Sequence, residues 1–206
     1  MRVHRLSRAE SRDRTRVLLV QAARRVFLRH GYHAATLDAV AEEAGFTKGA
    51  VYSAFDSKAD LFLAVLDERV ASRVREIAGA GAEAASHGAQ AEALARQFVA
   101  AIEHDPHWSA VVIEFWAHAS RDPELRKRFA ARHTTLRKAF ADAFEAMTQR
   151  TGRRLVFDAD RLATIGLALG NGFALEAMAG DDVDGDLLPQ VAGLFMTALT
   201  DGTGPR

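Results

Sequence analysis

Between residues 36 and 55 the chain combines groups that bind the phosphates and bases of DNA. Thr36 and Thr47 each stand where a short helix begins, so a hydroxyl and free backbone N–H groups are available to a phosphate oxygen. Gly49 and Ala50 are small enough for the backbone to approach a base pair, and the Ala50 methyl suits a thymine methyl. Tyr52 offers a phosphate its hydroxyl. The pattern predicts a DNA-contacting surface, with pure helix capping as the alternative role of the two threonines.

Two short helices and a tight turn position these groups. Apolar residues at helical spacing end at Ala44, and Gly45 follows where a left-handed residue closes a helix. Thr36 caps the first helix, and Thr47 caps the second, Lys48–Phe55. A glycine-containing turn between two such helices is typical of the helix-turn-helix, whose second helix enters the major groove. The segment therefore predicts duplex DNA as a partner.

Over this region the order and spacing of glycine, aromatic and capping residues resemble those of TetR-family (tetracycline-repressor-like, AcrR-type) transcriptional regulators. The matching positions are Arg25–Phe27, Gly31, Tyr32, Thr36, Ala41, Ala44, Gly45, Thr47, Gly49, Val51, Tyr52, Phe55, Ser57 and Lys58. The resemblance covers roughly residues 12–72 of the chain. It departs from the family pattern at Ala54, where a larger residue such as histidine is more frequent.

The resemblance implies more about the site and the mechanism than the residues do alone. The residues it places on the groove-facing helix are Lys48, Gly49, Ala50, Tyr52 and Ser53, and it implies that Lys58 reaches a phosphate. It also implies a homodimer that represses genes until a small-molecule inducer releases it from the DNA.

Composition and missing motifs exclude other classes of function. The chain has no cysteine, so disulfides, thiolate zinc sites and cysteine nucleophiles are excluded. It lacks a glycine-rich phosphate loop, a nucleophile elbow and a metal-binding His/Glu motif, so we expect neither an enzyme nor a cofactor. His104, Asp105 and His107 are close together, but no second cluster with metal-ligand spacing follows. We also find no apolar run approaching the roughly 18 residues of a membrane span and no signal peptide, so we expect a cytoplasmic protein without a membrane partner.

Charge is unevenly distributed although the formal net charge is zero. Residues 1–30 hold nine arginines and two acidic residues, which leaves a formal charge of +7 ahead of the helix-turn-helix. The arginines expected near phosphates or a minor groove are Arg2, Arg5, Arg8, Arg12, Arg14 and Arg16. A solubilising tail is the alternative for the first eight residues.

Helical periodicity throughout the chain predicts an all-α fold of about nine helices. We expect a three-helix DNA-binding domain over residues 1–73, with its helix-turn-helix at 36–55, and a helical ligand-binding and dimerisation domain over residues 80–206. Beyond the two short helices, caps and breakers predict helices over 11–30, from 58 after a Ser57 cap, and over 89–103, 107–120, 123–151, 158–179 and 187–199.

The helix over residues 158–179 carries Gly166, Gly170 and Ala174 four residues apart, on one face. Each glycine inside a helix costs about 1 kcal/mol relative to alanine, so we expect another helix to approach this face closely. We favour a homodimer through residues 158–179 and 187–200. The alternatives are a contact within the chain or space left for a ligand.

Aromatic and polar residues of the second domain suggest a cavity for a largely apolar inducer. The candidate lining residues are Trp108, Phe115, Trp116, His118, Phe140, Phe144 and Asn171. Ordinary core packing is the alternative for each aromatic residue. Glu114 is a further polar candidate, or pairs with His118 on an exposed helix face.

The sequence thus favours a repressor that leaves a pseudo-palindromic operator when a small molecule binds. One alternative is a helical ligand-binding protein or enzyme whose first domain no longer binds DNA. The other is an activator or an architectural DNA-binding protein without an inducer.

Overall fold

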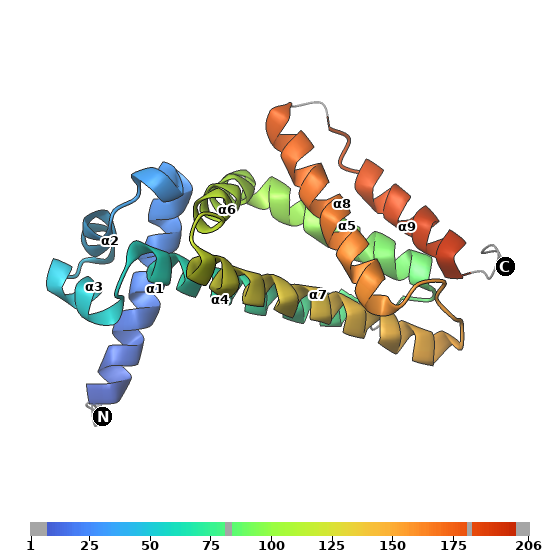
Figure 1. Cartoon of the computed structure of the whole chain (residues 1–206), viewed down its shortest axis with the longest axis horizontal. Coiled ribbons are helices and arrows are strands. Elements are labelled where there is room, and N and C mark those ends of the chain that lie inside the picture. The colour runs from blue at the N-terminus through green and yellow to red at the C-terminus, as the bar shows by residue number, and fades with distance from the viewer. Residues whose placement is uncertain (1–7, 81–83, 181–182, 201–206) are drawn as a thin grey trace, which may run out of the picture. The chain divides into compact units, whose positions relative to one another are not determined.

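The computed structural model describes residues 8–80, 84–180 and 183–200. Within these ranges every regular element is an α-helix, and there are nine (Figure 1). This confirms the all-α fold. Packing divides the chain into two compact units. Unit 1 comprises Met1–Arg69 and Ala110–Phe129, and unit 2 comprises Val70–Ser109 and Ala130–Arg206.

An aromatic core holds unit 1 together. Its helices are α1 (Arg8–Ala34), α2 (Leu37–Ala44), α3 (Lys48–Ala54), the start of α4 (Lys58–Ala80), the end of α6 (Pro106–Ala119) and the start of α7 (Pro123–Thr151). The buried Phe62 ring of α4 stacks on Phe115 of α6, with ring centroids 4.3 Å apart. It also meets Phe27 of α1 edge to face at 5.1 Å. These rings tie three helices together, while α2 packs on α1 and α3 on α2.

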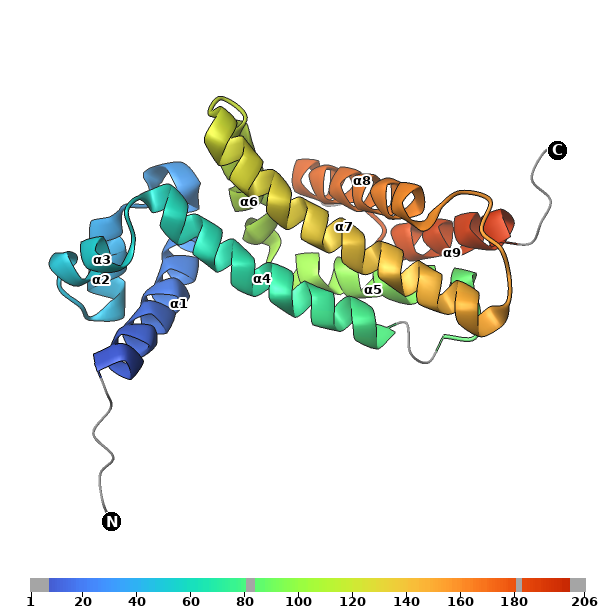
Figure 2. The ribbon, with the colours of Figure 1, turned by 60° about the horizontal axis from the view of Figure 1, so that its bottom comes forward.

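Unit 2 contains the rest of α4 and α7 together with α5 (His87–His104), α8 (Ala159–Ala179) and α9 (Leu187–Thr200). Helices α5 and α9 lie side by side (Figures 1 and 2). Gly88 of α5 permits this approach, because a Cβ there would overlap the Thr197 hydroxyl and stand 3.0 Å from the Gly193 carbonyl oxygen. A larger residue at position 88 would push α9 away.

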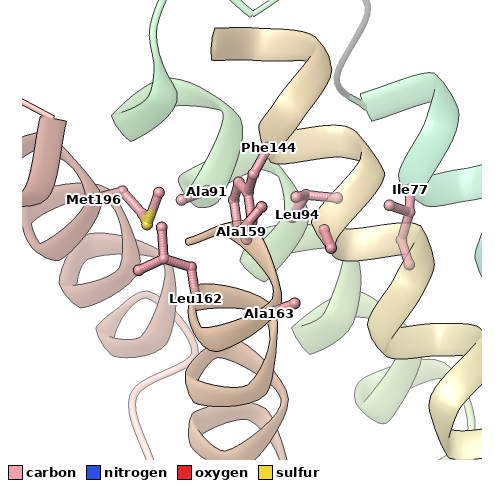
Figure 3. Close-up of a cluster of buried hydrophobic side chains, with 9 residues drawn as sticks. Ile77, Ala91, Leu94, Phe144, Ala159, Leu162, Ala163 and Met196 are labelled. Atoms are coloured by element: carbon pink, nitrogen blue, oxygen red, sulfur yellow. The ribbon is translucent and has the colours of Figure 1, made fainter. Parts of the chain in front are cut away.

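Small and large apolar side chains from five helices fill the core of unit 2 (Figure 3). Phe144 of α7 lies beside Ala91 of α5 and Ala159 at the start of α8. Leu162 and Met196 close the cluster from α8 and α9. The small residues let the helices approach closely, and the large ones fill the space between them.

Local capping explains where most helices begin and end, close to the predicted limits. Asp158 accepts the Arg161 N–H at the start of α8, and Asp122 accepts two N–H groups at the start of α7. Gly152, with φ 68°, follows the end of α7. Gly31, with φ 74° and ψ 174°, breaks the first helix as predicted, and a further helical stretch continues to Ala34.

The small-residue face of α8 turns partly toward its own chain. The Phe98 ring of α5 lies 3.3 Å from where a Gly170 Cβ would stand, and Ala174 is buried. Nothing lies within 4 Å of such a Cβ at Gly166. At Gly170, therefore, the alternative of a contact within the chain holds.

By length and composition, α8 could also cross a membrane, which corrects the expectation that no apolar run is long enough. A single helix of this length and composition does not establish a membrane span, because an apolar helix of a soluble protein passes the same test.

Candidate nucleic-acid interface

The predicted capping groups form the two helix starts of the helix-turn-helix. Thr36 Oγ1 accepts the Ala39 N–H at 3.1 Å, and Thr47 Oγ1 accepts the Ala50 N–H at 3.3 Å. Between the helices, Gly45 has φ 69° and ψ 28°, and its N–H donates to the Glu42 carbonyl at 3.1 Å. Glycine adopts this left-handed backbone without a Cβ clash. The caps were predictable because each depends on neighbours in sequence.

Helix α3 has a buried face and an exposed face. Val51 is fully buried and Phe55, just beyond the helix, is 3% exposed, as expected for core residues. The opposite face carries Lys48, Gly49, Tyr52 and Ser53, all exposed, with Ala50 half-buried at its edge. Tyr52, 57% exposed, is the largest side chain on this face. The five residues predicted to face a groove thus share one side of a helix.

Arg16 of α1 braces the C-terminal end of α3. Its guanidinium donates to the Ala54 carbonyl at 2.9 Å and lies 4.2 Å from the centre of the Phe55 ring. Arg12 and Arg14 are exposed on the same helix. Of the predicted basic arm, Arg2 and Arg5 lie outside the described residues. The Arg16 contact could not be predicted from the sequence, because it joins residues 38 positions apart in the chain.

Lys58 closes the C-terminal end of α1. Its ammonium donates to the carbonyls of Tyr32 at 2.8 Å, His33 at 2.8 Å and Ala35 at 3.0 Å. The pKa of Lys58 is lowered, because the effect of desolvation exceeds the opposite effect of the Glu114 carboxylate. Three carbonyls take its three donors, so a phosphate contact at Lys58, as the resemblance implies, requires it to exchange partners.

Glu114 of α6 holds the same turn from the other side. Its Oε2 accepts the N–H groups of Tyr32 at 2.8 Å and His33 at 3.2 Å. A Cβ at Gly31 would stand 2.8 Å from Oε1 of the same carboxylate. The His118 ring lies 5.2 Å from the Tyr32 ring. Glu114, which the sequence suggested as a ligand-binding group or a partner of His118, instead fixes the turn that leads into α2.

Lys48 and Asp38 form an ion pair across the two helices of the motif. The Lys48 Nζ lies 2.5 Å from Asp38 Oδ2, and both side chains are exposed. This hydrogen bond raises the pKa of Lys48. Asp38 was not among the predicted site residues.

The residues predicted to line a ligand cavity are divided between the units. In unit 1, Phe115 is fully buried in the aromatic core, Trp116 is 49% exposed and His118 is exposed. In unit 2, the half-buried Phe140 packs against the core cluster that contains Phe144. Trp108 is half-buried and Asn171 lies exposed on α8. The structure brings Phe140 and Phe144 together, and their role toward a ligand stays a prediction.

A half-open groove of about 300 Å³ lies in unit 2 between α4, α5 and α7. Its lining residues are Val74, Ala78, Gln90, Ala139, Asp142, Ala143, Ala146 and Arg150. The buried Gln90 donates through Nε2 to the Ala143 carbonyl at 3.0 Å. None of the seven predicted lining residues is among them. Alanines in a helix carry no sequence signal that separates groove from core.

No group of three or more His, Asp or Glu side chains in the described part of the chain is placed to hold a metal ion. Asp105, from the small cluster seen in the sequence, follows the last residue of α5, and its N–H donates to the Ile102 carbonyl.

Comparison with known families covers most of the chain. Residues 19–65 match the family model described as bacterial regulatory proteins of the tetR family, and residues 88–201 match the C-terminal model of BetI-type transcriptional repressors. The transcriptional activator FasR of Mycolicibacterium smegmatis is 36% identical over 103 residues, which are 50% of this chain and 47% of that protein. The match therefore spans about half of FasR. The repressor AcnR of Corynebacterium diphtheriae is 27% identical over 166 residues, 81% of this chain and 82% of AcnR.

Solved structures share the fold at low sequence identity. A TetR transcription regulator from Haloarcula marismortui superposes with a TM-score of 0.76 at 22% identity, over 92% of this chain and 100% of that one. FadR from Bacillus subtilis, crystallised in complex with stearoyl-CoA, superposes with a TM-score of 0.71 at 16% identity. The match covers 91% of this chain and 99% of the FadR chain.

Proposed function

Because the chain belongs to the TetR family of bacterial transcriptional regulators, we propose that it is a repressor that a small molecule releases from a pseudo-palindromic operator. Membership of this family makes the protein a DNA-binding regulator of transcription and confirms that it is not an enzyme. Its place of action is then the bacterial cytoplasm, where the DNA is.

The exposed face of α3 is the observation that carries the proposal. We assign the major groove to Lys48, Gly49, Ala50, Tyr52 and Ser53, because a helix inserted there presents its N-terminal residues to base edges. The N–H groups at the starts of α2 and α3 suit phosphate oxygens.

In this proposal the two capping threonines both cap a helix and contact a phosphate. The Thr36 and Thr47 oxygens already accept a backbone N–H, and each hydroxyl hydrogen can still donate to a phosphate. Lys58 is also a candidate phosphate contact, once it leaves the carbonyls that it now caps.

A homodimer through α8 and α9 is supported by the apolar side chains that these helices expose. They are Leu169, Leu175, Met178, Leu187, Val191, Leu194 and Phe195, with exposures from 36% to 73%. A second copy of these two helices would remove such apolar surface from water. A two-fold dimer would set two reading helices about 34–36 Å apart and so require a pseudo-palindromic site.

The groove between α4, α5 and α7 is our candidate inducer site. Its lining residues are mostly alanine and valine, and the polar ones are Gln90, Asp142 and Arg150. We propose a small, largely apolar inducer with one polar end. FadR, which shares the fold, was crystallised with stearoyl-CoA, which joins a long apolar acyl chain to a larger, charged coenzyme A group. To release DNA, the inducer must bind the DNA-free conformation more tightly than the bound one.

Gel-shift titration of the DNA upstream of the chain's own gene tests this function. A regulator gives one bounded complex, and its affinity falls steeply, by about 10³–10⁵ between roughly 50 and 200 mM salt for 6–10 phosphate contacts. Equal affinity for an unrelated duplex would reject operator recognition. Transcription from the same promoter, with and without protein, separates a repressor from an activator such as FasR.

A further inference from the structure

We propose that Asp38 and Lys48 together read one G·C base pair in each half-site, the ammonium at guanine and the carboxylate at cytosine. This inference rests on the proposed function and names part of the sequence that the operator must contain. Asp38 stands in the first turn of α2 and Lys48 begins α3, so their ion pair joins the two helix starts that face DNA.

The pair places a donor and an acceptor next to each other. Nζ of Lys48 and Oδ2 of Asp38 are 2.5 Å apart, while the side chains are 68% and 47% exposed. The start of α2 favours a carboxylate in its first turn, which supports this placement of Asp38. The two charged ends are therefore held side by side before DNA arrives, yet remain accessible.

The major-groove edge of a G·C pair presents the complementary arrangement. Guanine offers the acceptors N7 and O6, and the N4 amino group of cytosine, a donor, lies next to O6. An ammonium can donate to the guanine N7 and O6, and a carboxylate can accept from the cytosine N4 amino group. An A·T pair also gives the carboxylate the adenine N6 amino group, but its two acceptors, adenine N7 and thymine O4, lie on opposite sides of that group, so the ammonium can use only one of them.

Charge makes a passive role for Asp38 unfavourable. A carboxylate beside DNA phosphates is repelled unless donors surround it; Lys48 supplies one, and the base edges supply further donors only at cytosine or adenine. Lys48 is the only charged residue of α3, whose sequence is KGAVYSA. Discrimination by charged groups on the reading helix therefore depends on this one pair.

Selection from a randomised duplex library with the full-length protein tests the proposal without a known operator. Wild type should select a two-fold symmetric site with an invariant G·C pair at one position per half-site. Replacing that pair by A·T should weaken binding about tenfold. Asp38→Ala should lose the preference at that position only. Asp38→Asn should shift it toward A·T, because an asparagine amide pairs with adenine N6 and N7.

Glu42→Gln is the matched control, since it removes an equal charge from an exposed position on the same helix. It should leave the selected sequence unchanged. If Asp38→Ala changes the affinity for every duplex by one factor, or changes nothing, Asp38 does not read a base and the proposal is overturned. If wild type selects no sequence at all, the proposed function fails together with it.

Discussion

At the scale of single residues, the turn before the helix-turn-helix depends on three residues that act together. Gly31 takes a left-handed backbone, Glu114 accepts the next two N–H groups, and Lys58 donates to the carbonyls that follow. Glu114 and Lys58 satisfy backbone atoms that the broken helix leaves without partners. The orientation of α2 therefore depends on residues outside the motif itself.

Gly31→Ala should destabilise the protein by about 1–3 kcal/mol. The backbone at φ 74° strains any residue with a Cβ, and that Cβ would stand 2.8 Å from Glu114 Oε1. Urea unfolding of purified protein measures the change. Gly79→Ala is the control, because nothing lies within 4 Å of its added Cβ, and it should be neutral or slightly stabilising. Equal stability of the two variants would show that the turn is not strained.

Lys58→Met should lower the free energy of unfolding by on the order of 2 kcal/mol, because carbonyls at the end of α1 lose a charged donor. Lys48→Met is the comparison. Its exposed ion pair should contribute little to stability, so DNA affinity should fall while stability hardly changes. Thermal melts together with gel shifts separate the two effects. A Lys58→Met protein as stable as wild type would contradict the capping role.

At the scale of elements, helix limits were predictable and contacts between helices were not. Thr36, Gly45, Thr47 and Asp158 act on neighbours three or four residues away, so the sequence contains the whole signal. The Glu114 carboxylate reaches a turn 82 residues earlier in the chain. Such pairs depend on how helices pack, which periodicity does not encode.

The roles of the aromatic residues were also not predictable from helical periodicity. Helical spacing identifies Phe115 and Phe144 as residues of an inner face. It does not distinguish rings that only pack in a core from rings that also line a ligand cavity, and both of these rings are buried.

The start of α4 shows how one side chain can stabilise a helix and respond to pH. The Ser57 hydroxyl donates to Asp60 and accepts its N–H, and Arg128 of α7 pairs with the same carboxylate. The hydrogen bond from Ser57 and the Arg128 pair lower the pKa of Asp60. A lowered carboxyl pKa stabilises the folded state above the unfolded value of 3.8, and this stabilisation is lost as pH falls through the folded-state value.

Asp60→Asn should therefore reduce stability by about 1–2 kcal/mol at pH 7 and by progressively less below pH 4. Urea unfolding of both proteins between roughly pH 2.5 and 7 measures the difference. A difference that stays constant, or grows on acidification, would show that the carboxylate is not stabilised by its partners.

At the scale of the whole molecule, the proposed homodimer would link the exposed apolar side chains of α8 and α9 to recognition of DNA. Two copies joined by a two-fold axis bury the same patch on each side and double the number of reading helices. A single α3 of seven residues offers few base contacts. Affinity for an operator then depends on both copies binding together.

Leu194→Glu should raise the dimer dissociation constant at least tenfold, because the interface would have to bury two unpaired carboxylates across the axis. Leu194 is the most exposed of these apolar side chains, at 73%. Sedimentation velocity over a concentration series measures the effect. Val17→Glu adds the same charge to an exposed apolar position of α1, outside α8 and α9, and should leave the dimer intact. A wild-type protein that stays monomeric at all concentrations would refute the interface.

The central claim is that the exposed face of α3 touches base edges, and site-directed photo-crosslinking tests it most directly. The chain has no cysteine, so Ser53→Cys provides a unique attachment point for a benzophenone on that face, and Glu68→Cys provides one on an exposed face of α4. On the duplex that wild type protects, we predict crosslinks from position 53 to bases inside the protected site and none from position 68. Crosslinks from position 68 alone, or from neither position while the duplex stays bound, would contradict the account.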